Sequence, residues 1–334
     1  MIYFWHNRNE FNYSLNFFYE SIGASKQSFH QMMQRSKKMQ EEIFLLVELI
    51  KQIRKDHPTM NCRMMYYMIN PVFVGRDKFE SICKECGFLV GRPKSYRRTT
   101  DSNGVIRFEN LLKEFVISDI DQVWSTDITY FDINGVFYYL TFILDNYSRR
   151  ILGYHASSRL STEQTSLPAM KMAIRTRGKQ LKEDIIIHSD GGGQYYDDNF
   201  LLLTKKHKFK NSMCEFAWEN GKAERVNGII KNNYLIPWGT KTAKDLFKNI
   251  DRAVQLYNHE KPHSSLNRIT PVAFEEKIGK LALRNKSTMT ESIDEKGQIL
   301  GVESPQLSVR NKSQNLDIIS ENGVKNNLKT VNVY

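Results

Sequence analysis

The sequence predicts an α/β protein in which helices flank a mixed five-stranded sheet, with an all-α region in front of it. Two patterns predict this fold. Residues 1–90 place apolar side chains at the three- and four-residue spacing of helices. From Gln122 onward, apolar runs separated by tight turns replace that spacing, and helix-like segments then alternate with strand-like ones. A helical region followed by a larger α/β domain is therefore expected.

The first 90 residues are expected to form a helix-turn-helix region that binds DNA. Gly23 supplies a turn between two short helices, and Ser25 is suited to cap the second of them. Lys26 and Gln27 would then lie on a helix that faces the DNA. Further helical segments are expected over residues 41–53, 64–69 and 76–87.

The chain is basic, with a net charge of +11, and most of the excess lies in its first 100 residues. Such charge attracts a phosphate backbone but carries no sequence preference by itself. Residues 91–117 are interpreted as a basic linker, in which Lys94, Arg97 and Arg98 would follow the DNA backbone. A solvated linker without a ligand fits the same composition equally well.

Composition excludes several other classes of protein. Four cysteines in 334 residues are too few for a disulfide framework, and the CxxC at Cys83 and Cys86 lacks the two further ligands of a structural zinc site. The N-terminus has no continuous apolar segment typical of a signal peptide. The longest apolar run, over residues 136–144, is too short to span a bilayer. A cytoplasmic protein is therefore expected.

Residues 118–275 are expected to form the α/β domain. Three strands at 123–133, 136–144 and 151–157 are joined by tight turns and should form an antiparallel meander. Asp145 begins the second turn and is interpreted mainly as a turn residue. Helices are expected over 162–177, 197–207, 218–234 and 244–257, and further strands at 185–188 and 210–214.

This order, three strands and then alternating helices and strands, is that of the ribonuclease H-like fold. In that fold the fourth strand lies parallel to the first and beside it. Functional groups in such sheets gather at the ends of adjacent strands. Residues 276–334 lack periodicity and are expected to form a polar C-terminal tail.

Three acidic residues are the candidate catalytic and metal-binding groups: Asp127, Asp190 and Glu224. Asp127 lies inside an apolar strand, where an unpaired carboxylate is costly to bury. Asp190 ends the fourth strand and precedes three glycines, a position that an ordinary turn would also explain. Glu224 lies on a helix, and taken alone it is more often a solvated residue. Together, three carboxylates can bind two Mg²⁺ ions, or Mn²⁺ in their place, and support in-line displacement at phosphorus.

Four residues around these acids are expected to contact DNA. Gln194 and Tyr195 follow the glycines, which would let a phosphate approach the backbone closely. Lys231 lies seven residues after Glu224 and so shares its helix face, as does Asn227. Lys231 is expected to hold the reacting phosphate or its neighbour.

Five stretches in order make a joint pattern: QVWSTDITYF, FYYLTFILDNYSRRILGYHAS, IIIHSDGGGQYY, SMCEFAWENGKAERVNGIIKNNYL and YNHEKPHSSLNRITPVAF. With these stretches the chain resembles bacterial insertion-sequence transposases with a retroviral integrase-like, DDE-type catalytic core. The resemblance covers roughly residues 120–275. The chain departs from the family in SMCEFAWEN, which is shorter than usual.

The resemblance implies a Mg²⁺-dependent polynucleotidyl transferase that cleaves and joins DNA at the ends of a mobile element. It implies the triad Asp127, Asp190 and Glu224, and it matches Lys231 to a basic residue of the family. The implied partners are double-stranded DNA with terminal inverted repeats, target DNA, further copies of the chain and an upstream reading-frame protein. A location at the bacterial nucleoid is the corresponding expectation.

Two other functions fit the same residues. A catalytically inactive transposase remnant would bind DNA ends and act as a repressor. A ribonuclease H-like nuclease would cleave without joining. The intact acidic residues argue against the first, and the N-terminal helical region argues against the second.

Overall fold

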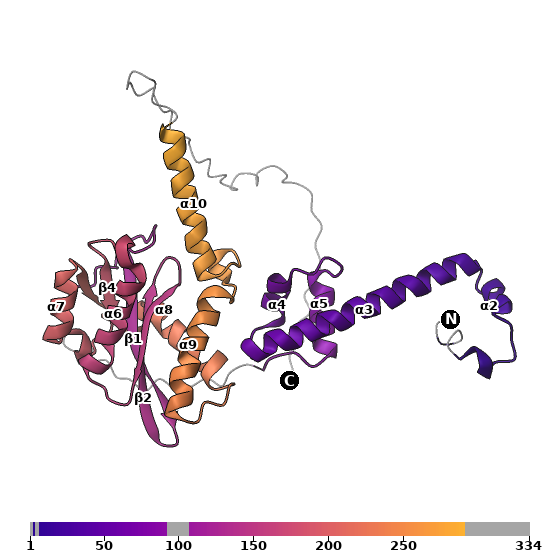
Figure 1. Cartoon of the computed structure of the whole chain (residues 1–334), viewed down its shortest axis with the longest axis horizontal. Coiled ribbons are helices and arrows are strands. Elements are labelled where there is room, and N and C mark those ends of the chain that lie inside the picture. The colour runs from indigo at the N-terminus through magenta and orange to yellow at the C-terminus, as the bar shows by residue number, and fades with distance from the viewer. Residues whose placement is uncertain (1–2, 4–6, 92–106, 291–334) are drawn as a thin grey trace, which may run out of the picture. The chain divides into compact units, whose positions relative to one another are not determined.

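The computed structural model describes residues 3, 7–91 and 107–290 of the chain. Its N-terminal part consists of helices α2 (Leu15–Ser21), α3 (Lys26–Asp56), α4 (Cys62–Ile69) and α5 (Arg76–Glu85), after a short turn η1 (Arg8–Glu10) (Figure 1). Gly23 has a φ of +63° in the turn after α2, and the Ser25 hydroxyl accepts a hydrogen bond of 3.1 Å from the backbone N–H of Ser28. The turn and the cap are as the sequence predicts.

Helix α3 differs from the expectation of two separate segments. It runs for 31 residues without a break. No glycine or proline occurs between Lys26 and His57, so nothing in the chain interrupts the helix once it has begun. Its C-terminal half packs with α4 and α5 in a small core that includes Ile50, Met65 and Phe79, all of which are fully buried.

The sheet has five strands in the order β3-β2-β1-β4-β5. The strands are β1 (Val123–Ile133), β2 (Val136–Asp145), β3 (Ile151–Ser157), β4 (Ile186–Ser189) and β5 (Lys210–Met213). The first three pair antiparallel, and β4 lies parallel to β1 with Ser125 opposite His188. Strand β5 is parallel to β4. This topology confirms the predicted ribonuclease H-like sheet and makes β1 its central strand.

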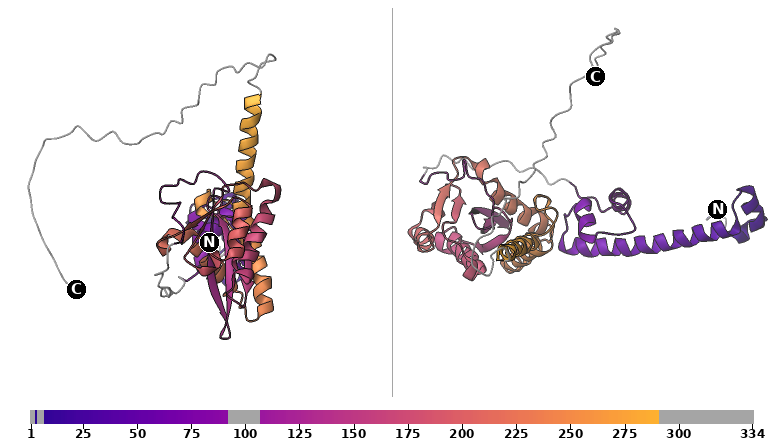
Figure 2. Two further views of the ribbon diagram at one scale, coloured as in Figure 1. Left: turned by 90° about the vertical axis from the view of Figure 1, so that its left-hand side faces the viewer. Right: turned by 90° about the horizontal axis from the view of Figure 1, so that it is seen from above.

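Helices cover both faces of the sheet. They are α6 (Ser166–Arg177), α7 (Asp198–Lys206), α8 (Gly221–Ile230) and α9 (Ala243–His259), and α10 (Pro271–Thr290) follows them and extends away from the sheet (Figure 1). Five short 3₁₀ helices and one π-helix, η6 (Lys231–Leu235), also lie in the described part of the domain; the 3₁₀ helices are η2 (Thr162–Gln164), η3 (Gly178–Gln180), η4 (Gly193–Tyr195), η5 (Ala217–Asn220) and η7 (Ser264–Leu266). Helices α6 and α7 lie on one side of the sheet and α8 and α9 on the other, as Figures 1 and 2 show.

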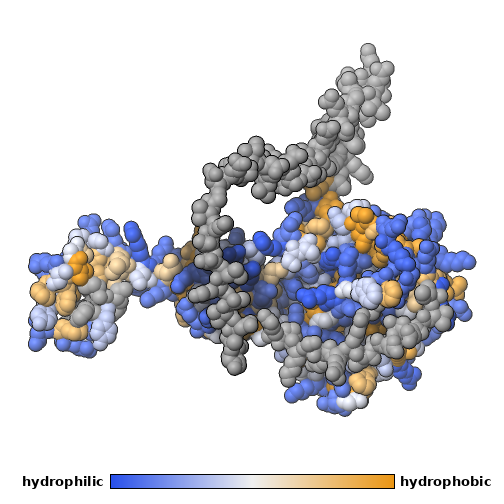
Figure 3. All heavy atoms as spheres, turned by 180° about the vertical axis from the view of Figure 1, so that it is seen from behind, coloured by the Kyte–Doolittle hydropathy of each residue, from blue (hydrophilic) through white to orange (hydrophobic). Residues whose placement is uncertain are grey.

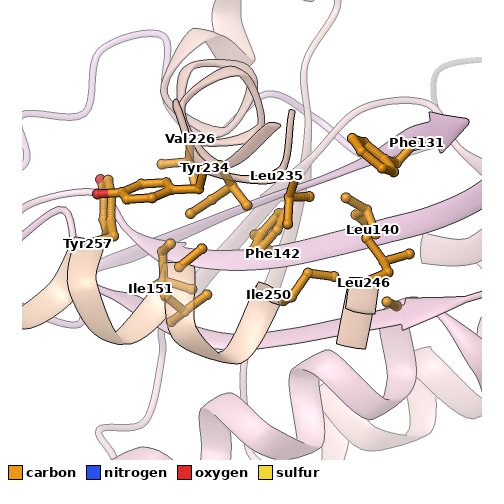
Figure 4. Close-up of a cluster of buried hydrophobic side chains, with 14 of the residues drawn as sticks. Phe131, Leu140, Phe142, Ile151, Val226, Tyr234, Leu235, Leu246, Ile250 and Tyr257 are labelled. Atoms are coloured by element: carbon orange, nitrogen blue, oxygen red, sulfur yellow. The ribbon is translucent and has the colours of Figure 1, made fainter. Parts of the chain in front are cut away.

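The core beneath α8 and α9 fixes the position of α8 on the sheet. Val226 of α8 packs with Phe142 of β2, and Ile250 of α9 packs in the same cluster (Figure 4). All three side chains are at most 2% exposed. A second cluster on the opposite face joins the sheet to α6 and α7 around Trp124 and Phe200. Because apolar area is buried on both faces, the central strand is held from two sides.

Two predicted helices have different bounds in the structure. The segment expected as one helix over 218–234 consists of the 3₁₀ turn η5, the α-helix α8 and the π-helix η6. Helix α10 continues to Thr290, so the first part of the expected polar tail is helical. Residues 291–334 lie outside the described residues.

Glu275 anchors the first turns of α10 to the domain. Its carboxylate accepts two hydrogen bonds of 2.8 Å from the Arg177 guanidinium, one of 2.6 Å from Arg150 and one of 2.7 Å from the Ser148 hydroxyl. Arg177 also donates to Asp121 at 2.7 Å. This buried network ties α10 to α6 and to the turn after β2.

The surface of the described chain is mixed. Hydrophilic residues cover most of the face drawn in Figure 3, and hydrophobic residues form small patches among them. None of the helices in the described part of the chain combines the length and the apolar composition that a membrane span requires.

Candidate functional site

Asp127 lies in the middle of the central strand β1, opposite Phe142 of β2. The side-chain amide of Asn227 on α8 donates a hydrogen bond of 2.7 Å to its Oδ2 atom. Burial raises the pKa of Asp127 to about 7, and the nearby carboxylates of Asp190 and Glu224 contribute to the rise. A neighbouring positive charge would therefore stabilise the ionised form of Asp127.

Asp190 follows the end of β4, the strand parallel to β1. The backbone N–H of Gly192 donates a hydrogen bond of 3.1 Å to Oδ1 of Asp190, and the Tyr196 hydroxyl donates to its backbone carbonyl at 3.2 Å. Burial raises the pKa of this carboxyl group above its usual range, although the Gly192 hydrogen bond opposes the shift. The predicted placement of Asp127 and Asp190 on neighbouring strands is confirmed.

Glu224 lies in the first turn of α8, with an exposed side chain. Two buried asparagines hold this helix against β1. Asn220 donates a hydrogen bond of 2.9 Å to the backbone carbonyl of Thr126, and Asn227 donates to the carboxylate of the next residue, Asp127. Glu224 lies between the two asparagines in the sequence. The two hydrogen bonds therefore direct the first turns of α8 toward Asp127.

The donor set suits a hard divalent cation. All three groups are carboxylates, and oxygen ligands are those that Mg²⁺ prefers. Within residues 7–91 and 107–290, no three His, Cys, Asp or Glu side chains lie close enough together to form a ready-made cation site. The acids do act on one another, because Asp190 and Glu224 both raise the pKa of Asp127. A divalent cation would relieve this repulsion, so the three carboxylates fit a bound Mg²⁺ or Mn²⁺.

Lys231 begins the π-helix η6 and lies beside the strand that carries Asp127. Its Nζ atom donates hydrogen bonds of 2.7 Å to Oγ1 of Thr129 and 3.3 Å to the carbonyl of Tyr130. Burial lowers the pKa of Lys231, and the charge of Asp127 opposes that effect. The ammonium group therefore rests on β1, two and three residues beyond Asp127.

Two of the predicted DNA contacts are corrected by the structure. Tyr195 is 2% exposed, because its ring packs in the core against Phe200 and its hydroxyl lies 3.2 Å from Oγ1 of Thr126. Asn227 is 4% exposed and its amide is committed to Asp127. Both side chains are buried beside the site, so neither is placed to contact DNA directly.

The other predicted DNA contacts stay predictions. Gln194 is half-buried, and its backbone carbonyl accepts a hydrogen bond of 2.9 Å from the Ser166 hydroxyl. Lys26 and Gln27 are exposed in the first turn of α3. Lys94, Arg97 and Arg98 lie outside the described residues.

Sequence reasoning missed the loop that precedes α8. Oε2 of Glu219 accepts hydrogen bonds from the backbone N–H groups of Glu215 and Phe216, at 2.7 and 3.0 Å. The rings of Phe216 and Trp218 stack with 4.3 Å between centroids and 4° between planes, and both are at least half exposed. The only sequence signal for this loop is that the stretch SMCEFAWEN is shorter than usual, and its length does not predict these hydrogen bonds or the ring stack.

The strand order defines the class of protein, since a mixed sheet with acids on its first strand, after its fourth and on the following helix is typical of a ribonuclease H-like nucleic-acid-processing core. Two family models match the chain, and both are described as an integrase core domain. One covers residues 119–217 and the other covers residues 206–271.

Curated relatives come from bacterial insertion sequences. The chain is 28% identical over 270 residues to the insertion element IS600 uncharacterized 31 kDa protein of Shigella sonnei. This match covers 78% of the present chain and 98% of the relative. It is 34% identical over 189 residues to the transposase InsF for insertion sequence IS3A of Escherichia coli K12, covering 55% and 63%. Residues 119–271 therefore match an integrase core domain, and the chain is similar to transposases of bacterial insertion sequences.

Solved structures with a similar chain path include retroviral integrases. The HTLV-2 integrase catalytic core domain in complex with magnesium is 22% identical, with a TM-score of 0.38, and the match covers 46% of this chain and 96% of that one. A simian T-cell lymphotropic virus intasome in complex with PP2A regulatory subunit B56 gamma is 19% identical, with a TM-score of 0.41, covering 61% and 67%.

Proposed function

We propose that this chain is a DDE-type DNA transposase that cleaves and joins DNA strands at the ends of an insertion sequence. Asp127, Asp190 and Glu224 would be its catalytic acids, and two Mg²⁺ ions, or Mn²⁺ in their place, its cofactor. The observation that carries the proposal is the approach of the other two acids to Asp127: burial raises the pKa of Asp127 to about 7, and the nearby carboxylates of Asp190 and Glu224 add to the rise. The similarity to transposases of bacterial insertion sequences supports the same proposal.

Each acid has a separate role in this proposal. Asp127 on the central strand would hold the ions together with Asp190 and Glu224. When bound, the ions would supply an activated water or 3′-hydroxyl and stabilise the leaving 3′-oxygen. Asn227 would keep the Asp127 carboxylate in one orientation through its hydrogen bond. Lys231, beside Asp127, would bind the reacting phosphate as a point charge.

Two successive displacements at phosphorus account for cleavage and joining. In the first, a water oxygen bonds to phosphorus and the strand's 3′-oxygen leaves as a hydroxyl. In the second, that 3′-hydroxyl attacks a target phosphodiester and displaces its 3′-oxygen, so the number of phosphodiester bonds is conserved. Both steps use one set of carboxylates, because each forms and breaks a bond at phosphorus along one line.

Recognition of DNA would fall mainly to the N-terminal helices. Lys26 and Gln27 are exposed at the start of α3, next to the turn at Gly23. The proposed partners are duplex DNA with terminal inverted repeats, target DNA, further copies of the chain and an upstream reading-frame protein, at the bacterial nucleoid. Pairing two DNA ends requires at least two copies of a chain that carries one set of acids.

An inactive remnant that represses by binding DNA ends is not favoured. All three acids are present, and buried asparagines on both sides of Glu224 still tie α8 to β1. A chain that only bound DNA would have no need for crowded carboxylates, which cost folding free energy when no cation neutralises them.

The deciding experiment incubates the purified chain with duplex DNA carrying the element's ends, in Mg²⁺ or Mn²⁺. Nicked ends and joined strands are expected from the wild type. Asp127→Asn should abolish both products and leave DNA binding nearly intact. Asp198→Asn, on exposed α7, is the matched control and should react like the wild type. Binding without products from the wild type would support the remnant, and nicks without joined strands would support a nuclease.

A further inference from the structure

Four cationic side chains outside the proposed catalytic set lie close enough to one another to interact electrostatically. Arg149 lies in the turn between β2 and β3, Lys222 and Arg225 lie in the first turns of α8, and Lys261 follows the end of α9. Arg149 and Arg225 are both close enough to Tyr257 to act on it electrostatically, and Lys222 is close to Arg149. These four residues, with His263, are called the cationic cluster below.

Polar groups in the cationic cluster lack partners. The Nη1 atom of Arg149 and the Nε2 atom of His263 are buried and find no hydrogen-bond partner within the described part of the chain. His263 is only 8% exposed, with its ring 4.7 Å from that of Tyr257. None of the four cations forms an ion pair with a described residue. Buried donors without acceptors are costly, so a ligand with acceptor atoms fits them.

Neighbouring arginines show the contrast. Arg150 and Arg177 are paired with the carboxylate of Glu275, and Arg177 is also paired with Asp121. Asp145 is the acid that acts on Arg149, but its own oxygens already accept hydrogen bonds from three backbone N–H groups. The protein therefore neutralises one group of arginines and leaves the adjacent cationic cluster with excess positive charge.

Electrostatics within the cluster agrees with this reading. Burial lowers the pKa of His263 to about 3, and Lys261, Arg149 and Arg225 lower it further, so the imidazole is neutral at neutral pH. Burial, and then Arg225, lowers the pKa of Lys261 to about 8. Arg149 also has a φ of +63°, a left-handed backbone that costs a non-glycine residue about 1 kcal/mol. A bound anion would offset the repulsion among these charges.

We propose that the cationic cluster binds a backbone phosphate of duplex DNA beside the carboxylate site. Guanidinium and ammonium groups are the donors that match phosphate oxygens. Arg225 is adjacent to Glu224 in the sequence. Trp124, which pairs with Asp145 at the start of the turn, lies three residues before Asp127 on β1, a separation of about 10 Å at strand spacing. A DNA strand whose phosphate is bound by the cationic cluster would pass the proposed catalytic acids. The choice of DNA as the source of phosphate rests on the proposed function.

Salt dependence of DNA binding tests this inference without any chemistry. Binding of a short duplex to the full chain is measured by fluorescence anisotropy in EDTA at several salt concentrations. Arg149→Gln and Lys261→Gln should each weaken binding about tenfold and reduce the slope of log K against log salt by about one. Arg149→Lys, which keeps the charge, should retain the slope. Arg175→Gln, on the exposed side of α6, removes the same charge elsewhere and should behave as wild type.

A second measurement separates DNA from free anions. Inorganic phosphate, compared with chloride at equal ionic strength, should raise the melting temperature of the wild type but not of Arg149→Gln. If Arg149→Gln loses this phosphate effect yet binds DNA with an unchanged slope, the cluster is an anion site and the DNA assignment is wrong. If Arg149→Gln matches Arg175→Gln in both measurements, the cluster binds no phosphate. Strand cleavage in Mg²⁺ is scored separately, so a wild type that binds DNA with the expected slopes but never cleaves would overturn only the proposed function.

Discussion

The side-chain amide of Asn227 donates a hydrogen bond of 2.7 Å to the carboxylate of Asp127, 100 residues earlier in the chain. The bond joins α8 to the central strand and favours the ionised form of a carboxyl group that burial would otherwise keep neutral. A cation needs that ionised form. Asn227 is therefore a positioning residue for the proposed metal site.

Asn227→Ala should lower the rate of strand cleavage by on the order of tenfold, since a hydrogen bond to a charged group contributes about 1.5–3 kcal/mol. Loss of the bond raises the pKa of Asp127 further, so the acid limb of the pH–rate profile should move to higher pH. Gln255→Ala, exposed on α9, is the control. An equal fall in rate at every pH, with no displacement of the profile, would assign Asn227 a purely structural role.

The raised pKa of Asp127 predicts a pH-dependent stability of the metal-free protein. The folded pKa of about 7 lies above the ordinary pKa of 3.8 for an aspartate, so the folded state holds more protons than the unfolded state between these pH values. Stability should then fall as the pH rises through this window. Asp127→Asn cannot ionise and should exceed the wild type in stability by about 4 kcal/mol at pH 8, with the difference becoming small near pH 4.

Chemical denaturation at pH 4, 6 and 8 in EDTA measures this difference. Mg²⁺ should reverse this stability difference at pH 8. The ion binds the ionised wild-type site, whereas the site of the variant has lost one carboxylate ligand. Asp198→Asn controls for the loss of a carboxylate elsewhere. A gap between wild type and Asp127→Asn that is constant from pH 4 to pH 8 would contradict the assigned pKa.

Much of the fold and the position of the acids follow from local sequence patterns. The strand over 123–133 was predictable because its apolar run is bounded by turn residues, and the adjacency of Asp127 and Asp190 follows from the strand order. Tyr195 was misplaced because a sequence position after glycines does not reveal which way a side chain points. Asn227 was placed on the helix that carries Glu224, but the hydrogen bonds of Asn220 and Asn227 to residues 126 and 127 are long-range and leave no local signature.

Glu275 should be a major contributor to stability even though it lies far from the acids in sequence. It accepts hydrogen bonds from Arg177 and Arg150; the Arg177 side chain is buried and that of Glu275 is 10% exposed. Glu275→Gln leaves the Arg177 charge poorly compensated and should cost about 3 kcal/mol of unfolding free energy. Glu276→Gln, the neighbouring position, should cost little. Equal stability of these two variants in urea would show that the pair adds nothing net.

The same pair predicts a loss of stability in acid. Burial alone would raise the pKa of Glu275, but the hydrogen bonds and charge of Arg177 bring it below the ordinary value. A lowered folded pKa contributes stability that is present above the unfolded pKa and is lost as the pH falls through the folded one. The stability gap between wild type and Glu275→Gln should therefore narrow below pH 4.5. A gap that widens in acid would reverse the sign of the assigned shift.

Glu219 should control the loop that carries the stacked rings of Phe216 and Trp218. One of its oxygens accepts two backbone N–H groups, and Glu219→Ala would leave both donors without that acceptor. Because the loop leads directly into α8, its loosening should reduce cleavage by roughly tenfold while leaving the melting temperature within a few degrees of wild type. Glu219→Gln keeps one acceptor oxygen and should retain most activity.

Limited proteolysis provides the independent readout. Proteolytic cleavage near Phe216 should accelerate in Glu219→Ala but not in Glu215→Ala, which removes only the ion pair with Lys113. Unchanged proteolysis together with full activity would mean that the aromatic stack, and not Glu219, holds this loop closed.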